Sequence, residues 1–314
     1  MQQNNSTQGW NSMNMIVKPN FFIVGAARSG TSSLAYNLGQ HPDIYISPIK
    51  EPFYFVSDFG LNDFDEYISL FKDAGDARAI GEASTGYLFD EHAPVAIHEL
   101  FPDAKIIIIL RNPVDMAFSY WRFTQIAGNE SKSFEEATSD EERRYRKTEE
   151  FKRKALNWWA MYLYIERAMY FSQVKRYFDI IGRCKVRVYI FEDFIKRIEE
   201  LYKELFAFLD VDANFTPDYS VKNEGGDIHS QFLKKLRDRK YPFIKNIFPV
   251  TFRVKLKSRL LDINRKKDEK IIMNTETRRR LEVFFEEDIR SLEQLLGYSI
   301  EAWKKKEQQV ISPF

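Results

Sequence analysis

The feature that most constrains the fold is the segment FFIVGAARSGTSSL, which covers residues 21–34. An apolar run ends at Gly25, a second glycine follows at Gly30, and apolar residues then recur at helical spacing at Leu34 and Leu38. This order predicts a buried strand, a glycine loop and a helix. Such a loop binds phosphate groups, because its backbone N–H groups and the positive end of the helix face the anion.

The loop lacks the lysine that nucleotide triphosphatases place directly after the second glycine. Thr31 occupies that position, and the cation of the loop is Arg28, which precedes Gly30. The most strand-like run, Ile106–Leu110, is followed by Arg111, where those enzymes often have an aspartate of the Mg²⁺ site. Two arginines without a metal-binding carboxylate predict an anionic ligand whose charge is neutralised by side chains alone.

Apolar runs alternate with amphipathic segments over most of the chain. We expect strands within residues 20–27, 43–47, 77–84, 105–113 and 186–193, and helices within 29–42, 92–104, 114–123 and 194–211. This alternation predicts βαβ units and a parallel sheet that is covered on both faces. The expected fold class is therefore α/β: a single P-loop-like domain with a central, mainly parallel sheet of about five strands, flanking helices and helical insertions.

The sequence divides into one domain, two insertions and two tails. Residues 1–18 are expected to be a disordered tail, 19–305 the domain and 306–314 a C-terminal tail. The insertion at 131–155 is densely charged, which is typical of a solvated helical face or of a lid over the substrate. The insertion at 234–270 carries 14 Lys or Arg against 4 Asp or Glu. It is either a solvated basic surface or a contact for an anionic acceptor or a membrane.

Charge and cysteine content limit the class of protein. The 314 residues carry a net charge of only +1, so the chain as a whole is not expected to bind nucleic acid. The single cysteine, Cys184, rules out an internal disulfide, and the N-terminus has no signal-peptide pattern; both favour a cytoplasmic location. The longest aliphatic run is far shorter than the roughly 18 residues of a membrane span. Assembly into a homo-oligomer stays open.

Arg111 and Ser119 predict a second anion site. Arg111 follows a strand at its carboxyl end, where α/β sheets bind ligands, and Pro113 begins a helix that carries Ser119. Arginine can bind a phosphate through two N–H groups, and serine adds a hydroxyl donor. A helix cap beside a surface arginine would explain the same residues, so the pattern by itself leaves both interpretations open.

Four motifs occur along the chain in the order GAARSGTSSL, KEPFYF, GEASTGYL and LRNPVDMAFSYW. Together they resemble the sulfotransferases that use 3′-phosphoadenosine 5′-phosphosulfate (PAPS), within the branch of heparan-sulfate-type and bacterial carbohydrate or natural-product enzymes. The resemblance covers roughly residues 20–305. It implies PAPS as co-substrate, no metal ion, and transfer of a sulfuryl group to a hydroxyl or amine of a small-molecule or glycoside acceptor.

The resemblance also implies which residues bind the donor. The 5′-phosphosulfate loop of the family matches Arg28, Ser29, Gly30, Thr31, Ser32 and Ser33, its 3′-phosphate site matches Arg111 and Ser119, and a late basic loop at the adenosine end matches Arg265, Lys266 and Lys267. For the late loop, a solvated basic surface is an equally good explanation.

The carboxylate that takes the acceptor proton in this family branch matches Glu51. Aromatic residues at 53–55 are expected to desolvate Glu51 and raise its pKa toward neutrality. The alternative is that Glu51 only pairs with Lys50 or caps a turn. Glu82 is the second candidate, which would orient the acceptor or hold a cation, and Lys50 or Arg28 would stabilise the charge of the leaving group.

Two other functions remain open at the level of the sequence. A phosphate-loop kinase would use ATP and Mg²⁺ on a small substrate, although the missing lysine argues against it. A non-enzymatic module would bind a nucleotide or an anionic surface through residues 234–270, with an affinity that falls as salt rises.

Overall fold

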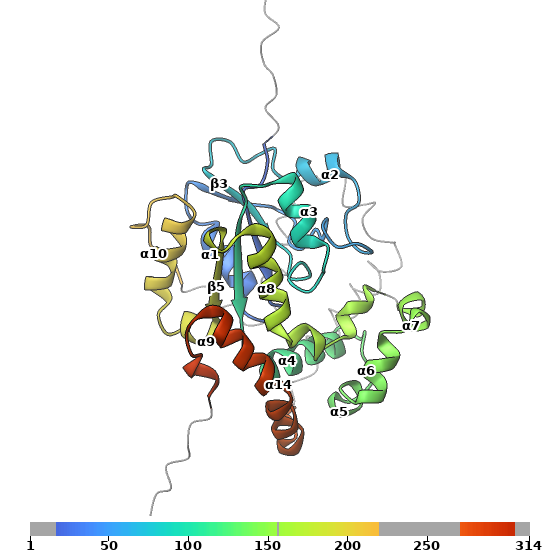
Figure 1. Ribbon diagram of the computed structural model, residues 1–314. Helices are drawn as coiled ribbons and strands as arrows, with labels where there is room; N and C mark the ends of the chain where they lie inside the picture. The colour runs from blue at the N-terminus through green and yellow to red at the C-terminus, as the bar shows by residue number, and fades with distance from the viewer. Residues whose placement is uncertain (1–16, 156, 220–270, 305–314) are drawn as a thin grey trace, which may run out of the picture.

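The computed structural model describes residues 17–155, 157–219 and 271–304. Within them, parallel strands form a single five-stranded sheet in the order β2-β3-β1-β4-β5 (Figure 1). The strands are β1 (Phe21–Gly25), β2 (Ile44–Ile46), β3 (Ala79–Ala83), β4 (Lys105–Leu110) and β5 (Val186–Ile190). Each lies within a segment for which the sequence predicts a strand, and the α/β fold class is confirmed.

Helices cover both faces of the sheet. The longer ones are α1 (Thr31–Leu38), α3 (Ala93–Leu100), α4 (Pro113–Ile126), α8 (Tyr170–Ile181), α10 (Ile198–Phe208) and α14 (Thr275–Leu296). Shorter α-helices are α2 (Phe64–Ser69), α5 (Phe134–Ala137), α6 (Asp140–Arg146), α7 (Glu149–Lys154) and α9 (Phe191–Phe194). Single 3₁₀ turns lie at Trp159–Tyr162, Glu166–Ala168, Arg183–Lys185 and Glu301–Trp303.

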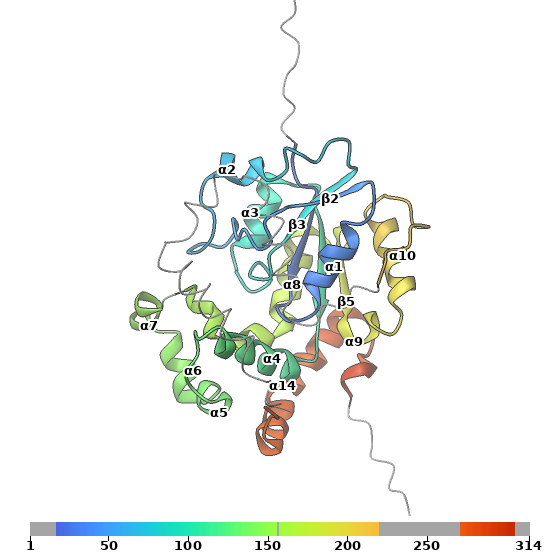
Figure 2. The ribbon, with the colours of Figure 1, turned by 180° about the vertical axis from the view of Figure 1, so that it is seen from behind.

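Two apolar cores lie on the two faces of the sheet. Helices α1 and α10 pack on one face, and α3, α4, α8 and α14 pack on the other, as the opposite views of Figures 1 and 2 show. The central strands β1 and β4 are almost wholly apolar and buried, as expected for parallel strands that are covered on both sides. Because β1 leads into α1 on one face and β4 leads into α4 on the other, the carboxyl ends of β1 and β4 form the crevice in which α/β sheets bind ligands.

The segment 186–193 is only partly a strand. Strand β5 ends at Ile190, and the chain then turns into the short helix α9. The side chain of Glu192 explains the turn, since it accepts hydrogen bonds from the backbone N–H of Asn112 (2.9 Å) and from the indole N–H of Trp303 (2.8 Å). These bonds connect α9 to the end of β4, next to the predicted anion site.

The charged insertion at 131–155 contains the helices α5, α6 and α7. Ser133 and Glu136 form the capping box that their spacing predicts. Most charged side chains of α6 and α7 are exposed, but Arg146 is buried between the carboxylates of Glu130 and Glu142, both at 2.8 Å. The insertion is therefore attached to the domain through a buried ion network, and a role as a lid stays a prediction.

Replacing Arg146 by methionine is expected to lower the free energy of unfolding by about 3 kcal/mol, because two buried carboxylates lose their cation. Chemical denaturation of the variant and of the wild type measures this difference. Arg144→Met is the matched control, since Arg144 lies on the same helix and is exposed. Equal stability of the Arg146 variant and the wild type would contradict the role of the network.

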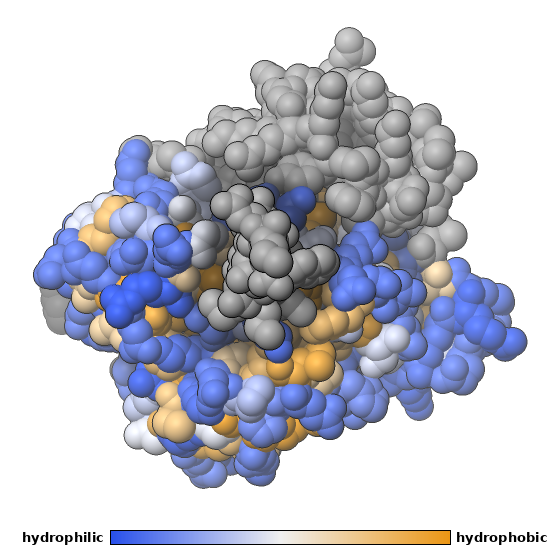
Figure 3. Space-filling model, turned by 90° about the horizontal axis from the view of Figure 1, so that it is seen from above, coloured by the Kyte–Doolittle hydropathy of each residue, from blue (hydrophilic) through white to orange (hydrophobic). Residues whose placement is uncertain are grey.

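The surface seen from above is mostly hydrophilic at its rim, with smaller hydrophobic areas between the polar residues (Figure 3). Among the described residues, none of the helices combines the length and the apolar character that crossing a membrane requires. The basic insertion at 234–270, with Arg265, Lys266 and Lys267, lies outside the described residues, as does the tail at 306–314 and most of the tail at 1–18.

Candidate functional site

The loop between β1 and α1 presents an uncapped helix N-terminus. Gly30 is the N-cap residue of α1 and adopts a left-handed conformation (φ 82°), and no side chain caps the helix. A Cβ atom at Gly30 would lie 2.9 Å from the ring of Phe191, so the position has no room for a side chain. The first N–H groups of α1 can therefore bind an anion, as the glycine spacing predicts.

Arg28 joins this loop to α4. Its backbone is in the left-handed region (φ 60°), which costs a non-glycine residue about 1–2 kcal/mol. Its Nε donates a hydrogen bond to Oγ of Ser119 (3.2 Å), and its guanidinium lies 5.1 Å from the ring centre of Phe123. The guanidinium of Arg111 donates to the backbone oxygen of Arg28 (3.3 Å). The structure thus brings the predicted phosphosulfate loop and the predicted 3′-phosphate pair into contact.

Positive charge accumulates at this point, because the guanidinium of Arg111 contacts the backbone of Arg28, and the charge of Glu51 offsets only part of the effect on Arg28. Burial, and then the charge of Arg111, lower the pKa of Arg28. In the part of the chain that the structure describes, neither guanidinium forms an ion pair with a carboxylate. Two neighbouring cations repel each other unless an anion lies between them, so the arrangement is suited to a phosphate or sulfate group.

The remaining loop residues differ in exposure. Ser29 and Thr31 are buried, and the Ser29 hydroxyl faces the backbone oxygen of Ala27 (3.4 Å). Ser32 and Ser33, in the first turn of α1, are half-buried. The structure therefore leaves Ser32 and Ser33 as the loop hydroxyls nearest to solvent.

Glu51 lies in the loop after β2, next to the end of β3. Its backbone N–H donates to the oxygen of Ala83 (3.0 Å), and its φ of 58° is again left-handed. Oε1 accepts a hydrogen bond from the hydroxyl of Thr85 (2.7 Å) and lies 3.6 Å from Nζ of Lys50. Because 32% of the side chain stays exposed, the carboxylate is held in place and is still accessible to a substrate. Strained backbone at Arg28 and Glu51 is typical of functional sites.

Glu82 has a different environment, although it also ends a strand. It is fully buried, and its carboxyl group accepts hydrogen bonds from the hydroxyls of Ser84 (2.7 Å), Tyr87 (2.6 Å) and Tyr67 (3.3 Å). Burial raises the pKa of Glu82 to about 7, against the opposing effect of these hydrogen bonds. Without exposed surface, Glu82 has no direct access to an acceptor in this conformation.

The raised pKa of Glu82 predicts a pH-dependent stability. The folded state holds the proton more tightly than the unfolded state, in which the pKa is near 4.5, so stability falls as pH rises from about 4.5 to 7. The full difference is roughly 3 kcal/mol. Glu82→Gln cannot titrate, so its stability relative to the wild type should increase over this range in denaturation curves at several pH values. Asp288, whose pKa burial raises to about 6, is present in both proteins and cancels in the difference. A pH-independent difference would contradict the prediction.

Three residues near the site had no motif to indicate them individually. Thr85 binds Glu51, and Arg167 donates through Nη2 to the backbone oxygen of Thr85 (3.1 Å). Burial raises the pKa of Tyr120, and the positive charge of Arg167 opposes this effect. Thr85 and Tyr120 lie within the motifs GEASTGYL and LRNPVDMAFSYW, which gave them no role of their own, whereas Arg167 lies far from every motif.

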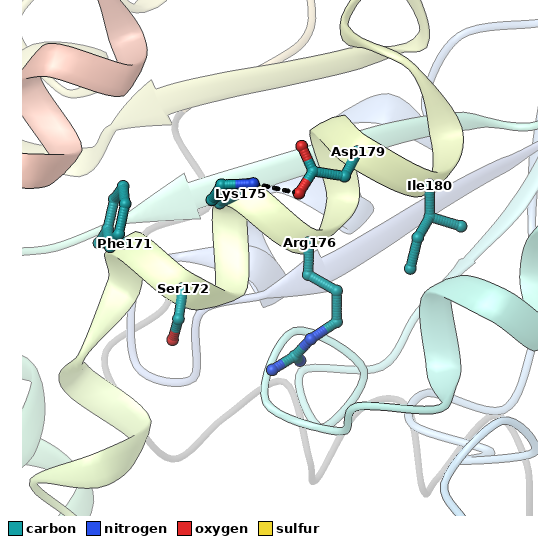
Figure 4. Close-up of a pocket in the computed structure, with 6 residues that line it drawn as sticks. All are labelled: Phe171, Ser172, Lys175, Arg176, Asp179 and Ile180. Carbon is teal, nitrogen blue, oxygen red and sulfur yellow. Dashed lines mark hydrogen bonds and ion pairs between the residues drawn. The ribbon is translucent and has the colours of Figure 1, made fainter.

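A separate hollow of about 350 Å³ lies along α8 (Figure 4). Its lining comes from one helix, on which Lys175 and Asp179, one turn apart, form an ion pair. The lining residues are Phe171, Ser172, Lys175, Arg176, Asp179 and Ile180. None of them belongs to the anion site or to the surroundings of Glu51, so this hollow is not the candidate functional site.

Comparison with known proteins shows which family has this fold and sequence. The family model described as a sulfotransferase domain matches residues 18–292. A sulfotransferase structure from Alicyclobacillus acidocaldarius is 31% identical, with a TM-score of 0.69, and the match covers 92% of this chain and 100% of that one.

Two curated relatives match over shorter segments. The membrane-associated sulfotransferase kil1 of Dictyostelium discoideum is 30% identical over 112 residues, which are 35% of this chain and 24% of kil1. The human bifunctional heparan sulfate N-deacetylase/N-sulfotransferase 3 is 33% identical over 111 residues, 33% of this chain and 13% of that protein. These matches thus span only a small part of the curated relatives. Since the family model covers most of the chain and a solved sulfotransferase matches over its full length, this chain belongs to the sulfotransferase domain family.

Proposed function

We propose that the protein transfers a sulfuryl group from PAPS to a hydroxyl or amine group of a small-molecule or glycoside acceptor, such as a natural product, and releases adenosine 3′,5′-bisphosphate. The observation that carries this proposal is the contact between Arg28 and the Arg111–Ser119 region beside the uncapped N-terminus of α1. Membership of the sulfotransferase family supports it and argues against the kinase and the non-enzymatic module.

The residues present fit a donor with phosphate groups at two places. The N–H groups of α1 would hold the 5′-phosphosulfate, because Gly30 leaves the helix end open. Arg111 and Ser119 would hold the 3′-phosphate beside α4. Arg28, which contacts Arg111 and Ser119, would add positive charge between the 5′-phosphosulfate and the 3′-phosphate. When bound, PAPS supplies the sulfuryl group in a mixed phosphate–sulfate anhydride.

Glu51 is proposed as the general base. As the acceptor oxygen or nitrogen forms its bond to sulfur and the bond from sulfur to the 5′-phosphate oxygen breaks, the acceptor proton passes to the Glu51 carboxylate. Thr85 donates from its hydroxyl to Oε1 of Glu51 and thereby orients the carboxylate. Nζ of Lys50 lies 3.6 Å from Oε1 of Glu51, and Lys50 and Arg28 are the cations that would stabilise the charge of the leaving group.

The surroundings of Glu51 indicate an acceptor with an apolar part. The ring centres of Phe53, Phe59 and Phe89 lie 6.2–6.5 Å from that of Trp158. Phe53 also packs on Phe59 at 5.4 Å, and it follows Glu51 closely in the chain. Such a cluster also serves as core, so the acceptor class is part of the proposal. A cytoplasmic location stays a prediction based on the single cysteine.

A ligand screen tests the donor. Thermal unfolding is measured with PAPS, adenosine 3′,5′-bisphosphate and ATP, each with and without Mg²⁺. The bisphosphate and PAPS are expected to stabilise the fold without Mg²⁺, by about 2.7 kcal/mol at a hundred times the dissociation constant. Stabilisation by ATP only with Mg²⁺ would reject the proposal in favour of the kinase. Incubation of labelled PAPS with a metabolite collection then identifies the acceptor.

A further inference from the structure

Arg167 is a buried cation without a carboxylate partner in the described part of the chain. It is 4% exposed, and Nε and Nη1 have no hydrogen-bond acceptor there. The rings of Tyr120, Trp158 and Phe89 surround the guanidinium at 5.0, 5.2 and 5.5 Å from their centres. The one hydrogen bond that the guanidinium donates to a described residue runs from Nη2 to the backbone oxygen of Thr85 (3.1 Å).

Arg146 shows how the same fold treats a buried arginine that serves stability. Arg146 is also enclosed by aromatic rings, those of Tyr162 and Tyr164, but two carboxylates neutralise it at 2.8 Å. Burying a cation without a carboxylate is costly, and aromatic faces offset only part of that cost. A methionine of similar shape would fill the Arg167 site at less cost, so stability does not explain why an arginine occupies it.

The position of Arg167 suggests what it does. Residues 84–87, which follow β3, form the surface on which the Glu51 segment rests: Ser84 accepts the N–H of Phe53 (3.3 Å), and Thr85 donates to Glu51 (2.7 Å). The hydroxyl of Ser84 in turn donates a hydrogen bond to the buried carboxyl group of Glu82. Thr85 is held by Arg167, which comes from a segment 82 residues away in the sequence.

We propose that Arg167 is a positioning residue for the proposed base: it fixes the Thr85 peptide, and the Thr85 hydroxyl in turn holds the Glu51 carboxylate in the orientation that faces the acceptor. This inference rests on the proposed function, in which Glu51 takes the proton. A displacement of about 1 Å in a catalytic group can lower a rate roughly 100-fold, so a residue that only holds the base has a measurable effect.

The test compares Arg167→Met, Thr85→Val and the double variant. Arg167→Met is expected to lower kcat about 10- to 100-fold, with the acceptor found by the labelled-PAPS screen, and to leave the affinity for adenosine 3′,5′-bisphosphate unchanged. Its melting temperature should stay close to that of the wild type, whereas Arg146→Met should lower it. Thr85→Val should lower kcat by a similar factor. The double variant should be no slower than the slower single variant, because both changes break the same connection.

A crystal structure of Arg167→Met gives a result that needs no acceptor: the hydrogen bond between Thr85 and Glu51 should be lost. Arg167→Lys, which keeps the charge and a donor, should regain part of the turnover. An intact Thr85–Glu51 bond in Arg167→Met, an unchanged kcat, or independent effects in the double variant would each overturn the inference. Wild-type turnover in Glu51→Gln would instead reject Glu51 as the base. Failure of the wild-type protein to bind the bisphosphate would reject PAPS as the donor.

Discussion

Replacing Glu51 by glutamine is expected to lower turnover about 100-fold or more, while the affinity for adenosine 3′,5′-bisphosphate stays unchanged. Glutamine has nearly the same shape, and its side-chain oxygen can still accept the hydrogen bond from Thr85 that Glu51 accepts at 2.7 Å. It cannot take a proton and carries no charge, so the loss reports the carboxylate and not the shape of the side chain. Initial rates with labelled PAPS and a titration with the bisphosphate measure the two quantities separately.

Glu91→Gln is the matched control for this experiment. Glu91 is exposed and contacts Arg176, and neither residue belongs to the proposed site. The control should turn over at the wild-type rate. Near-normal turnover in Glu51→Gln would reject the assignment of the base and leave the donor site untouched. Reduced affinity for the bisphosphate in that variant would mean that Glu51 acts through the fold of the site and not as a base.

Arg111→Ala is expected to weaken binding of adenosine 3′,5′-bisphosphate about 10- to 100-fold, because hydrogen bonds to a charged phosphate contribute about 1.5–3 kcal/mol. Adenosine 5′-monophosphate, which lacks the 3′-phosphate, makes the test specific. The wild type should prefer the bisphosphate, and Arg111→Ala should lose most of that preference. Calorimetric titration gives the dissociation constants of both nucleotides, and their ratio measures the preference.

The same two nucleotides show which phosphate group Arg28 binds. The side chain of Arg28 contacts Ser119. If Arg28 binds the 5′-phosphate, Arg28→Ala should weaken both nucleotides by a similar factor. A loss confined to the bisphosphate would place Arg28 at the 3′-phosphate, beside Arg111. Arg187→Ala on β5 is the control, since Arg187 is exposed and stacks on Phe208 outside the site. Unchanged affinities in Arg111→Ala would reject the account of two phosphate positions.

The sheet and its helices could be predicted because their signals are local. The buried runs of β1 and β4, and the helical spacing after Gly30, depend on residues that are close in the sequence. The end of β5 was harder to predict. The expected strand continued to residue 193, but the turn into α9 depends on contacts of Glu192 with Asn112 and with Trp303, 111 residues away.

The site also combines features that local sequence predicts with features that long-range contacts decide. Glu51 and Glu82 both follow strands and both have apolar or aromatic neighbours in the sequence, so the pattern makes each a candidate base. In the structure Glu51 keeps access to solvent beside Lys50, whereas Glu82 is fully buried among hydroxyl groups. Exposure depends on which segments pack over a residue, and these segments are distant in the sequence.

By itself, the sequence determined the α/β fold, the glycine loop without its lysine, and the family. The donor-binding residues that it suggests stay a prediction. Only the tertiary structure decided that Arg28 meets Ser119, 91 residues away, and that Arg167 supports Thr85 and, through it, Glu51. The physical reason is range. Backbone geometry and hydrophobic periodicity act over a few neighbouring residues, whereas the partners of a charged side chain are chosen by the packing of helices and strands that the whole chain brings together.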